Sequence, residues 1–310
     1  MIVALFLSAL RKGMEFRCDG VPAFRYYPGE AFGVATKPFS FRSGKWLLRG
    51  ERYFLPGTSY KGVMVFFHGL GAGHTAYSQE IAYFAKHGYL VYAYDNTGCM
   101  TSEGRGIGCL SQSLLDQKAF FAFLDKEEEA KGLPRYAIGH SWGGFTAFGA
   151  LQKEYGVKKV ISISGFLSLS EALMEQRPFL RKMEGLLRAS LRRGYGKYGD
   201  PNVLEWIAQS DAELLYVYGE NDTIVPKDRN YDVLQRHFRN SPKVKLLLVN
   251  DLHHNPYWTL ESSAYYVEII QKHHLARVDF DNQFVIDETK LNKDDPLILK
   301  KMLRFLEENA

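Results

Sequence analysis

The feature that most constrains the fold of this chain is a regular alternation of short apolar runs and amphipathic stretches. The continuous apolar run over residues 63–67 predicts a strand buried on both faces, and residues 90–94 predict another buried strand. Further strands are predicted over residues 136–139, 160–164, 214–218 and 245–249. Apolar positions at helical spacing predict helices between and after them, over residues 75–87, 110–131, 142–155, 227–238 and 259–275. Such alternation predicts an α/β fold, in which a mostly parallel central sheet is flanked by helices on both faces.

Three further segments complete this picture. Residues 39–55 are typical of two strands around a Ser-Gly turn, and Asp295-Pro296 begins a terminal helix that reaches about Glu308. Residues 166–212 separate two strands by far more chain than one crossover needs, with helical patches at 169–176, 179–193 and 201–209. We therefore expect one core domain, made of residues 1–165 and 213–310, and a helical cap insertion over residues 166–212.

Composition excludes several other classes of protein. With 310 residues, 46% apolar and 24% charged, the chain is long enough for one large globular domain and is not disordered, collagen-like or a coiled coil. Its three cysteines are odd in number and form no C-x-x-C, which argues against a disulfide scaffold or a zinc cluster. The net charge of +4 gives no reason to expect nucleic acid as a partner.

The strongest motif is Gly139-His140-Ser141-Trp142-Gly143-Gly144, which fits G-x-S-x-G between a predicted strand and a predicted helix. A sharp strand-to-helix turn of this kind forces its serine into a strained backbone conformation, and flanking glycines remove side chains that would clash. The motif predicts that Ser141 is a nucleophile above the carboxyl edge of the sheet. The alternative is a glycine-rich packing turn with no chemical role.

A serine nucleophile needs a base, and the base needs an acid that orients it. Asp222 lies in the loop after strand 214–218, where it is the predicted acid; Glu220 is the fallback, and capping of the next helix is the structural alternative. His253 and His254 both follow strand 245–249, so the order serine, acid, histidine is that of a catalytic triad. A metal site is a poor alternative for the two histidines, because no nearby residues complete a tetrahedral set.

Together these segments resemble the α/β-hydrolase superfamily of serine hydrolases over roughly residues 40–275. The matching pieces are His68-Gly69-Leu70-Gly71, Asp95 to Gly98 with Ser102-Glu103-Gly104, the motif at 139–144, Gly219 to Pro226 and His254-Asn255. The resemblance implies that the backbone N–H groups of Leu70 and Trp142 form an oxyanion hole. It also favours His254 over His253 as the base, since His-Asn-Pro resembles the family's sequence before the last helix.

The function expected from the resemblance is hydrolysis of a carboxylic ester through an acyl-enzyme, without metal or organic cofactor. A peptidase or amidase, a thioesterase and an acyltransferase use the same residues, and a non-catalytic binding protein is the remaining alternative. The substrate would be a small acyl compound, anionic or hydrophobic. Residues 177–197 of the predicted cap contain seven Lys and Arg against one Glu, a net charge of 7 − 1 = +6. A solvated helix face or attraction of an anionic group would each explain this charge.

Residues 1–10 are nearly all apolar, yet ten residues are too few to span a bilayer. A signal peptide would carry positive charge before this run and a small-residue cleavage site after it, and both are missing. We expect a cytoplasmic protein without a transmembrane span whose N-terminus forms a short buried helix or strand. A peripheral membrane contact and an atypical leader stay open, and the sequence predicts no oligomeric state.

Overall fold

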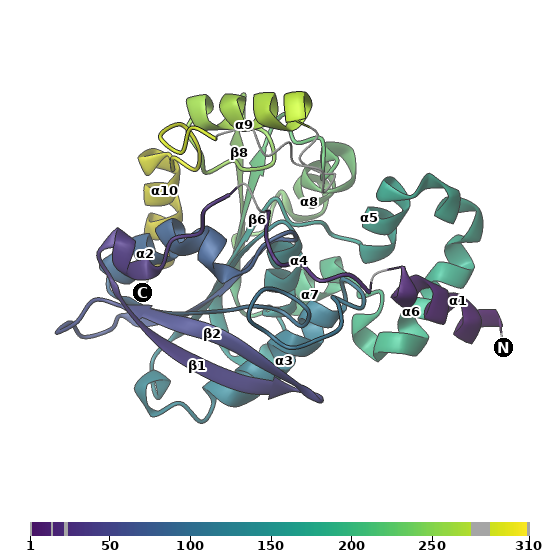
Figure 1. The fold of residues 1–310 in the computed structure, drawn as a ribbon, viewed down its shortest axis with the longest axis horizontal. Coiled ribbons are helices and arrows are strands. Elements are labelled where there is room, and N and C mark those ends of the chain that lie inside the picture. Colours follow the sequence, from purple (N-terminus) through teal and green to yellow (C-terminus); the bar gives the residue numbers. More distant parts are fainter. Residues whose placement is uncertain (1, 14, 22–23, 274–285, 309–310) are drawn as a thin grey trace.

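The central element of this computed structural model, which describes residues 2–13, 15–21, 24–273 and 286–308, is one eight-stranded sheet (Figure 1). Its strands lie in the order β1-β2-β4-β3-β5-β6-β7-β8. They are β1 (Ala35–Ser43), β2 (Trp46–Phe54), β3 (Gly62–Phe67), β4 (Tyr89–Tyr94), β5 (Arg135–His140), β6 (Val157–Ile163), β7 (Glu213–Gly219) and β8 (Val244–Val249).

The sheet is mostly parallel, as the alternation predicts. β1 and β2 form an antiparallel hairpin, and β2 also pairs antiparallel with β4. Every neighbouring pair from β4 to β8 is parallel. The carboxyl ends of β3, β5, β6, β7 and β8 therefore meet along one edge of the sheet, where parallel α/β sheets carry their sites.

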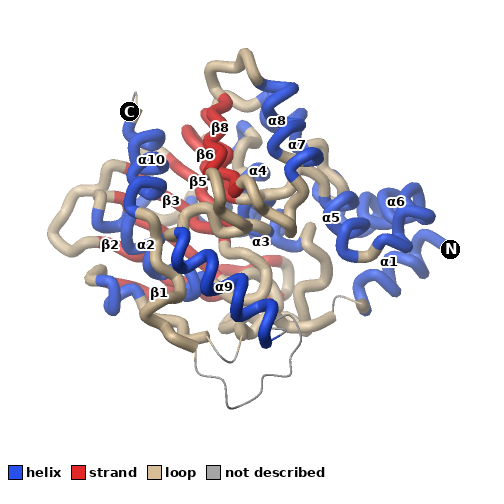
Figure 2. The backbone as a smooth tube through the Cα atoms, turned by 90° about the horizontal axis from the view of Figure 1, so that it is seen from above, coloured by secondary structure: helices blue, strands red, loops and turns tan. Residues whose placement is uncertain are grey.

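Helices cover both faces of this sheet, and the strand residues alternate between two apolar clusters. Val63, Val65 and Phe67 of β3 face a cluster that includes α3 (Gln112–Leu124), α4 (Trp142–Gly149) and α8 (Tyr231–Phe238). Met64 and Phe66 face the cluster that includes α2 (Ser78–Lys86) and α10 (Pro296–Glu307). Figure 2 shows α2 and α10 apart from α3 and α4, and Figure 1 shows α9 (Leu260–His273) on the side of the molecule away from α3.

Two predicted helices are shorter than their apolar pattern suggested. The pattern over 142–155 predicts one helix, but α4 ends at Gly149 and residues 153–155 form a separate turn of 3₁₀ helix. The pattern over 110–131 likewise covers α3, which ends at Leu124, and another 3₁₀ turn at Glu128–Ala130. In both cases the predicted range includes a short 3₁₀ turn that follows the end of the α-helix, so the apolar spacing alone overestimates the length of the helix.

Residues 166–212 contain three α-helices between β6 and β7. They are α5 (Leu169–Gln176), α6 (Glu184–Tyr195) and α7 (Val203–Gln209), with a 3₁₀ helix at Pro178–Met183 between the first two. Ser168 caps α5 and Asn202 caps α7, each by accepting a hydrogen bond from a backbone N–H of the first turn. We call residues 166–212 the insertion segment.

The apolar N-terminus forms a helix, α1 (Ile2–Lys12), that packs against α6 at one end of the molecule (Figure 1). Leu7 and Leu10 are buried in this contact, while Ile2 and Leu5 are 68% and 63% exposed. The expectation of a buried element is therefore wrong for one side of the helix. None of the helices in the described ranges has both the length and the apolarity that crossing a membrane requires.

Candidate active site

Ser141 lies at the turn between β5 and α4, at the carboxyl edge of the sheet. Its backbone has φ 57° and ψ −117°, which is an unfavourable conformation for a residue with a side chain. The turn is held on both sides, because Ser141 N donates to Ile163 O at 2.8 Å and its carbonyl accepts from Phe145 N at 3.0 Å. The strained turn predicted from G-x-S-x-G is therefore present.

The glycines of the motif are required because backbone carbonyl groups lie where a Cβ atom at these positions would be. A Cβ at Gly139 would overlap the carbonyl of Gly143, and a Cβ at Gly143 would overlap the carbonyl of Phe67 at the end of β3. Any larger residue at either position would push α4 away from the sheet. The hydroxyl of Ser141 would move with it.

The structure brings Ser141, His254 and Asp222 together. His254 Nε2 lies 2.8 Å from Ser141 Oγ, and His254 Nδ1 lies 2.8 Å from Asp222 Oδ2. His253 does not contact the serine; its half-buried ring instead contacts the carbonyl of Asn221 through Nδ1 at 3.0 Å. Glu220, the fallback acid, is exposed as well.

Asp222 is held as a carboxylate. Burial opposes its ionisation, but the hydrogen bond from His254 and those from the backbone N–H groups of Val225 and Ile224 outweigh burial and keep its pKa below the ordinary value. The two backbone bonds, at 3.0 and 2.8 Å, go to Oδ1 and leave Oδ2 to the imidazole. The orientation of the carboxylate is thus fixed by its own loop.

A pocket opens beside Ser141, and it has a mainly apolar floor. It holds about 650 Å³ of space outside protein atoms, part of it open to solvent. Leu70, Trp142, Leu110, Phe166, Ile224 and Val225 contribute to its walls. Leu70 and Trp142, the residues predicted to donate to an oxyanion, thus lie at the same pocket as Ser141.

One wall of this pocket comes from the insertion segment and is charged. Glu171, Ala172, Glu175 and Gln176 of α5 line it, opposite Arg229 of the loop between β7 and α8. Arg229 Nη1 lies 3.0 Å from Glu171 Oε2 and also pairs with Glu175. Arg181 pairs with both glutamates too, so neither carboxylate is free.

Sequence reasoning missed a hydrogen-bonded chain that links the loops around Ser141. His140 Nε2 donates to the carbonyl of His254 at 2.9 Å, and the Tyr77 hydroxyl donates to His140 Nδ1 at 2.9 Å. The backbone N–H of Gly69 in turn donates to Tyr77 Oη at 3.1 Å. Burial, followed by repulsion from His254, lowers the pKa of His140 to about 3, so the ring stays neutral.

The loop after β3, which contains Leu70, is tied down by two more buried histidines. His68 donates from Nδ1 to the Gly69 carbonyl at 2.7 Å and accepts from Asn96 N at 3.0 Å. His74 Nδ1 lies 2.7 Å from Asp95 Oδ1. Burial disfavours a charged His74, yet the attraction and hydrogen bond of Asp95, with help from Glu51, raise its pKa to about 9. Spacing in the sequence gave no signal for this ion pair.

Comparisons with known proteins agree with this architecture. A family model described as serine aminopeptidase S33 matches residues 58–205. An esterase of Pyrococcus furiosus has a similar structure, with a TM-score of 0.59 and 19% identity, over 85% of this chain and 96% of that one. Est1E of Butyrivibrio proteoclasticus, solved with ferulic acid bound, gives 0.58 and 15% over 87% and 98%.

An acylaminoacyl peptidase of Pyrococcus horikoshii is also similar, with a TM-score of 0.57 and 18% identity over 80% of this chain and 44% of that one. No curated protein shows a significant match to the sequence. The sheet order, the strained serine turn and the family-model match together lead to one conclusion. This chain has the α/β-hydrolase fold.

Proposed function

We propose that this protein is a serine hydrolase that cleaves carboxylic esters through an acyl-enzyme, with Ser141 as nucleophile, His254 as base and Asp222 as the orienting acid. The observation that carries the proposal is the continuous contact from Ser141 Oγ to His254 Nε2 and from His254 Nδ1 to Asp222 Oδ2, each 2.8 Å. Both distances are within the reach that proton transfer and tautomer control require.

The proposed reaction begins when Ser141 Oγ attacks the carbonyl carbon of the ester and its proton passes to His254 Nε2. The negative charge that develops on the carbonyl oxygen would be stabilised by the backbone N–H groups of Leu70 and Trp142, where loss of a single such donor typically costs about 3–4 kcal/mol. The imidazolium then gives its proton to the departing alkoxide, which leaves as an alcohol. Water, deprotonated by His254, releases the carboxylic acid and restores Ser141.

The insertion segment fits the role of a cap. In this cap, α5 would cover the pocket and α6 would lie behind α5. Support comes from the four α5 residues that line the pocket. Its third helix, α7, instead packs on the core, where Val203 and Ile207 join the apolar cluster of α4 and Ser210 Oγ donates to Leu151 O at 2.8 Å. We propose that the substrate's acyl group lies between α5 and the apolar residues beside Ser141.

An ester is favoured over a free aminoacyl substrate because of the charges in this wall. An aminopeptidase must bind a cationic α-amino group, which needs a carboxylate free to pair with it. Both glutamates of α5 that face the pocket are already paired with Arg229 and Arg181. The family description and the peptidase relative keep peptide hydrolysis as the competing activity to be measured.

The nucleophile is tested with a fluorophosphonate probe. We expect wild type to be labelled and Ser141→Ala not to be, while Ser164→Ala, which removes another serine with positive φ at the end of the neighbouring strand, keeps its label. Labelling that survives Ser141→Ala would contradict the proposal. His254→Ala should abolish hydrolysis of a p-nitrophenyl ester and His253→Ala should not.

The substrate class is tested with p-nitrophenyl esters of increasing acyl length beside aminoacyl p-nitroanilides. We expect kcat/KM for the better esters to exceed that for every anilide. Faster turnover of the anilides, lost in Ser141→Ala, would replace the esterase proposal by a peptidase.

A further inference from the structure

The end of the molecule formed by α1 and the first part of the insertion segment has an unusual surface. α1 is apolar around nearly its whole circumference, with Leu7 and Leu10 buried against the protein. Its opposite side carries Ile2 and Leu5, 68% and 63% exposed. A helix on the surface of a soluble domain normally presents polar residues on that side, so this second apolar face calls for a partner.

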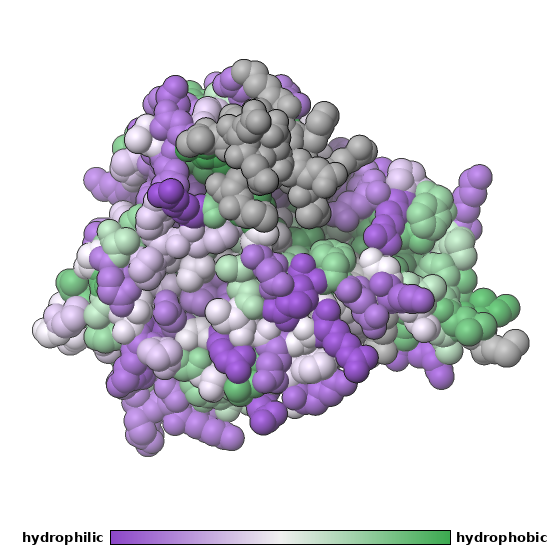
Figure 3. Space-filling model, in the orientation of Figure 1, coloured by the Kyte–Doolittle hydropathy of each residue, from purple (hydrophilic) through white to green (hydrophobic). Residues whose placement is uncertain are grey.

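The same end carries other exposed apolar side chains. Phe179 is 63% exposed and Met183 is 37% exposed, both in the turn of 3₁₀ helix that precedes α6. α1 is attached to this region, since Ser190 of α6 donates to the carbonyl of Val3 at 3.2 Å. Figure 3 shows hydrophobic residues gathered at this end of the molecule, with hydrophilic ones beside them. We call Ile2, Leu5, Phe179 and Met183 the apolar tip.

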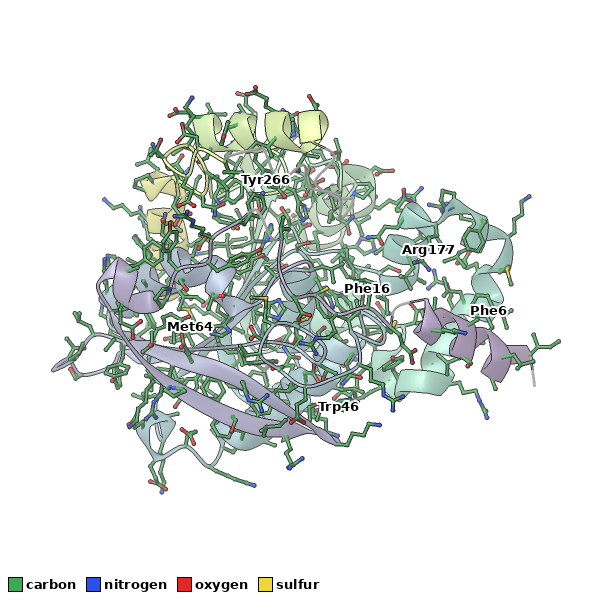
Figure 4. The ribbon with its side chains drawn as sticks, in the orientation of Figure 1. Phe6, Phe16, Trp46, Met64, Arg177 and Tyr266 are labelled. Atoms are coloured by element: carbon green, nitrogen blue, oxygen red, sulfur yellow. The ribbon has the colours of Figure 1, made fainter. Side chains whose placement is uncertain are left out.

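The charge of residues 177–197, which include Phe179 and Met183 of the apolar tip, is positive and only partly neutralised. Of the seven cations in residues 177–197, four are paired with described acids: Arg181, Arg188, Arg192 and Lys197. Arg177, Lys182 and Arg193 are exposed and form no ion pair within the described part of the chain, and Lys12 at the end of α1 is exposed too. Figure 4 shows Arg177 and Phe6 at the same end of the molecule.

The cations left unpaired among the described residues suggest that the net charge of +6 on residues 177–197 does not serve to attract an anionic substrate into the pocket. At the pocket wall, Arg181 and Arg229 are neutralised by Glu171 and Glu175. Arg177 and Lys182 instead flank Phe179 along the chain, and Arg193 lies on α6, the helix that contacts α1. Apolar side chains bordered by lysine and arginine complement a lipid surface, which has apolar acyl chains beneath anionic headgroups.

We propose that the apolar tip docks on an anionic lipid surface, with Ile2, Leu5, Phe179 and Met183 inserted among the acyl chains and Lys12, Arg177, Lys182 and Arg193 against the headgroups. Docking involves no transmembrane span, since α1 has 11 residues. It is independent of the catalytic proposal, because binding requires neither Ser141 nor turnover.

The test is co-sedimentation of the full chain with vesicles of phosphatidylcholine alone and of phosphatidylcholine mixed with phosphatidylglycerol. We expect binding to the mixed vesicles, weakened by high salt because exposed charges are screened. A double variant, Ile2→Glu with Leu5→Glu, should weaken that binding at least about tenfold, given what burial of two aliphatic side chains contributes. Lys182→Gln with Arg193→Gln should weaken binding to the mixed vesicles only.

The single variant Ile2→Glu has a matched control in Leu297→Glu, which introduces the same single charge at a residue that is also 68% exposed but lies on α10, at the other end of the molecule (Figure 1). It should bind vesicles like wild type. The thermal midpoint of each variant is measured first, so that lost binding is not lost folding. Absence of binding by wild type, or equal losses in the Leu297 variant, would overturn the proposal. So would a dimer that Leu5→Glu separates, because a second copy would then cover the tip.

Discussion

Tyr77→Phe is the change that most directly tests how the loops around Ser141 are held. It removes a single hydroxyl, which accepts from Gly69 N at 3.1 Å and donates to His140 Nδ1 at 2.9 Å. Both partners are buried, so the variant leaves one donor and one acceptor without a protein partner. At about 1–3 kcal/mol for each of the two unsatisfied groups, we expect a loss of about 2–6 kcal/mol in the free energy of unfolding. For a chain of 310 residues the thermal midpoint should fall by about 3–9 °C.

The same change should affect catalysis through Leu70, which follows Gly69. If the Leu70 amide stabilises the developing oxyanion, a looser Gly69 should lower kcat more than it changes KM, because that amide acts in the transition state. Kinetics on a short p-nitrophenyl ester, together with urea unfolding, measure both effects.

The control for this experiment is Tyr83→Phe, also on α2, where a half-buried tyrosine loses a hydroxyl that makes no hydrogen bond within the described residues. It should keep wild-type stability and rates. If Tyr77→Phe has the same free energy of unfolding as this control and keeps its kcat, the hydrogen bonds that link Gly69 to His254 contribute to neither stability nor catalysis. A loss of stability with unchanged kcat would restrict that role to folding.

The remaining predictions concern the acid, the buried ion pair and the core. Asp222→Asn should lower kcat by about 10⁴-fold while the protein stays folded, because the imidazole loses tautomer control; the exposed Asp228→Asn in the same loop should keep wild-type rates. His74 has a folded-state pKa of about 9, above its unfolded value of about 6.5, so its stabilisation is complete below pH 6.5 and disappears as the pH rises through 9. Urea unfolding should therefore show a gap between wild type and His74→Gln that shrinks by roughly 3 kcal/mol from pH 6 to pH 10. Phe145→Ala should cost about 3–5 kcal/mol, as this fully buried ring stacks on Phe166 at 4.6 Å between centroids.

The sheet and the serine turn could be predicted because each depends on local sequence. A strand buried on both faces must be apolar throughout, as Val63 to Phe67 are, and few other structures tolerate such a run. The strained Ser141 requires glycines beside it, which leave a visible motif. The positions of Asp222 and of the two adjacent histidines could also be predicted, because the loops that contain them directly follow β7 and β8, whose sequences are recognisable as strands.

What could not be predicted depends on contacts between distant residues. Nothing around Tyr77 distinguishes it from a core tyrosine, and its role appears only when α2 lies beside His140. The choice between His253 and His254 depends on which way each side chain leaves the loop, which sequence spacing does not determine. The apolar N-terminus likewise predicts burial but not that only one side of α1 is covered.

The two histidines nearest Ser141 have opposite requirements, and the fold separates them. The rings of His140 and His254 lie 4.9 Å apart, so a charge on one disfavours a charge on the other. His140 is fully enclosed, and its two ring nitrogens are committed, one donating to the His254 carbonyl and one accepting from Tyr77. A protonated His140 would have no acceptor nitrogen for that tyrosine, and burial lowers its pKa to about 3. His254 faces the Asp222 carboxylate instead, which stabilises the imidazolium that the proposed mechanism forms. Holding His140 neutral therefore leaves the positive charge to His254, the histidine that contacts Ser141.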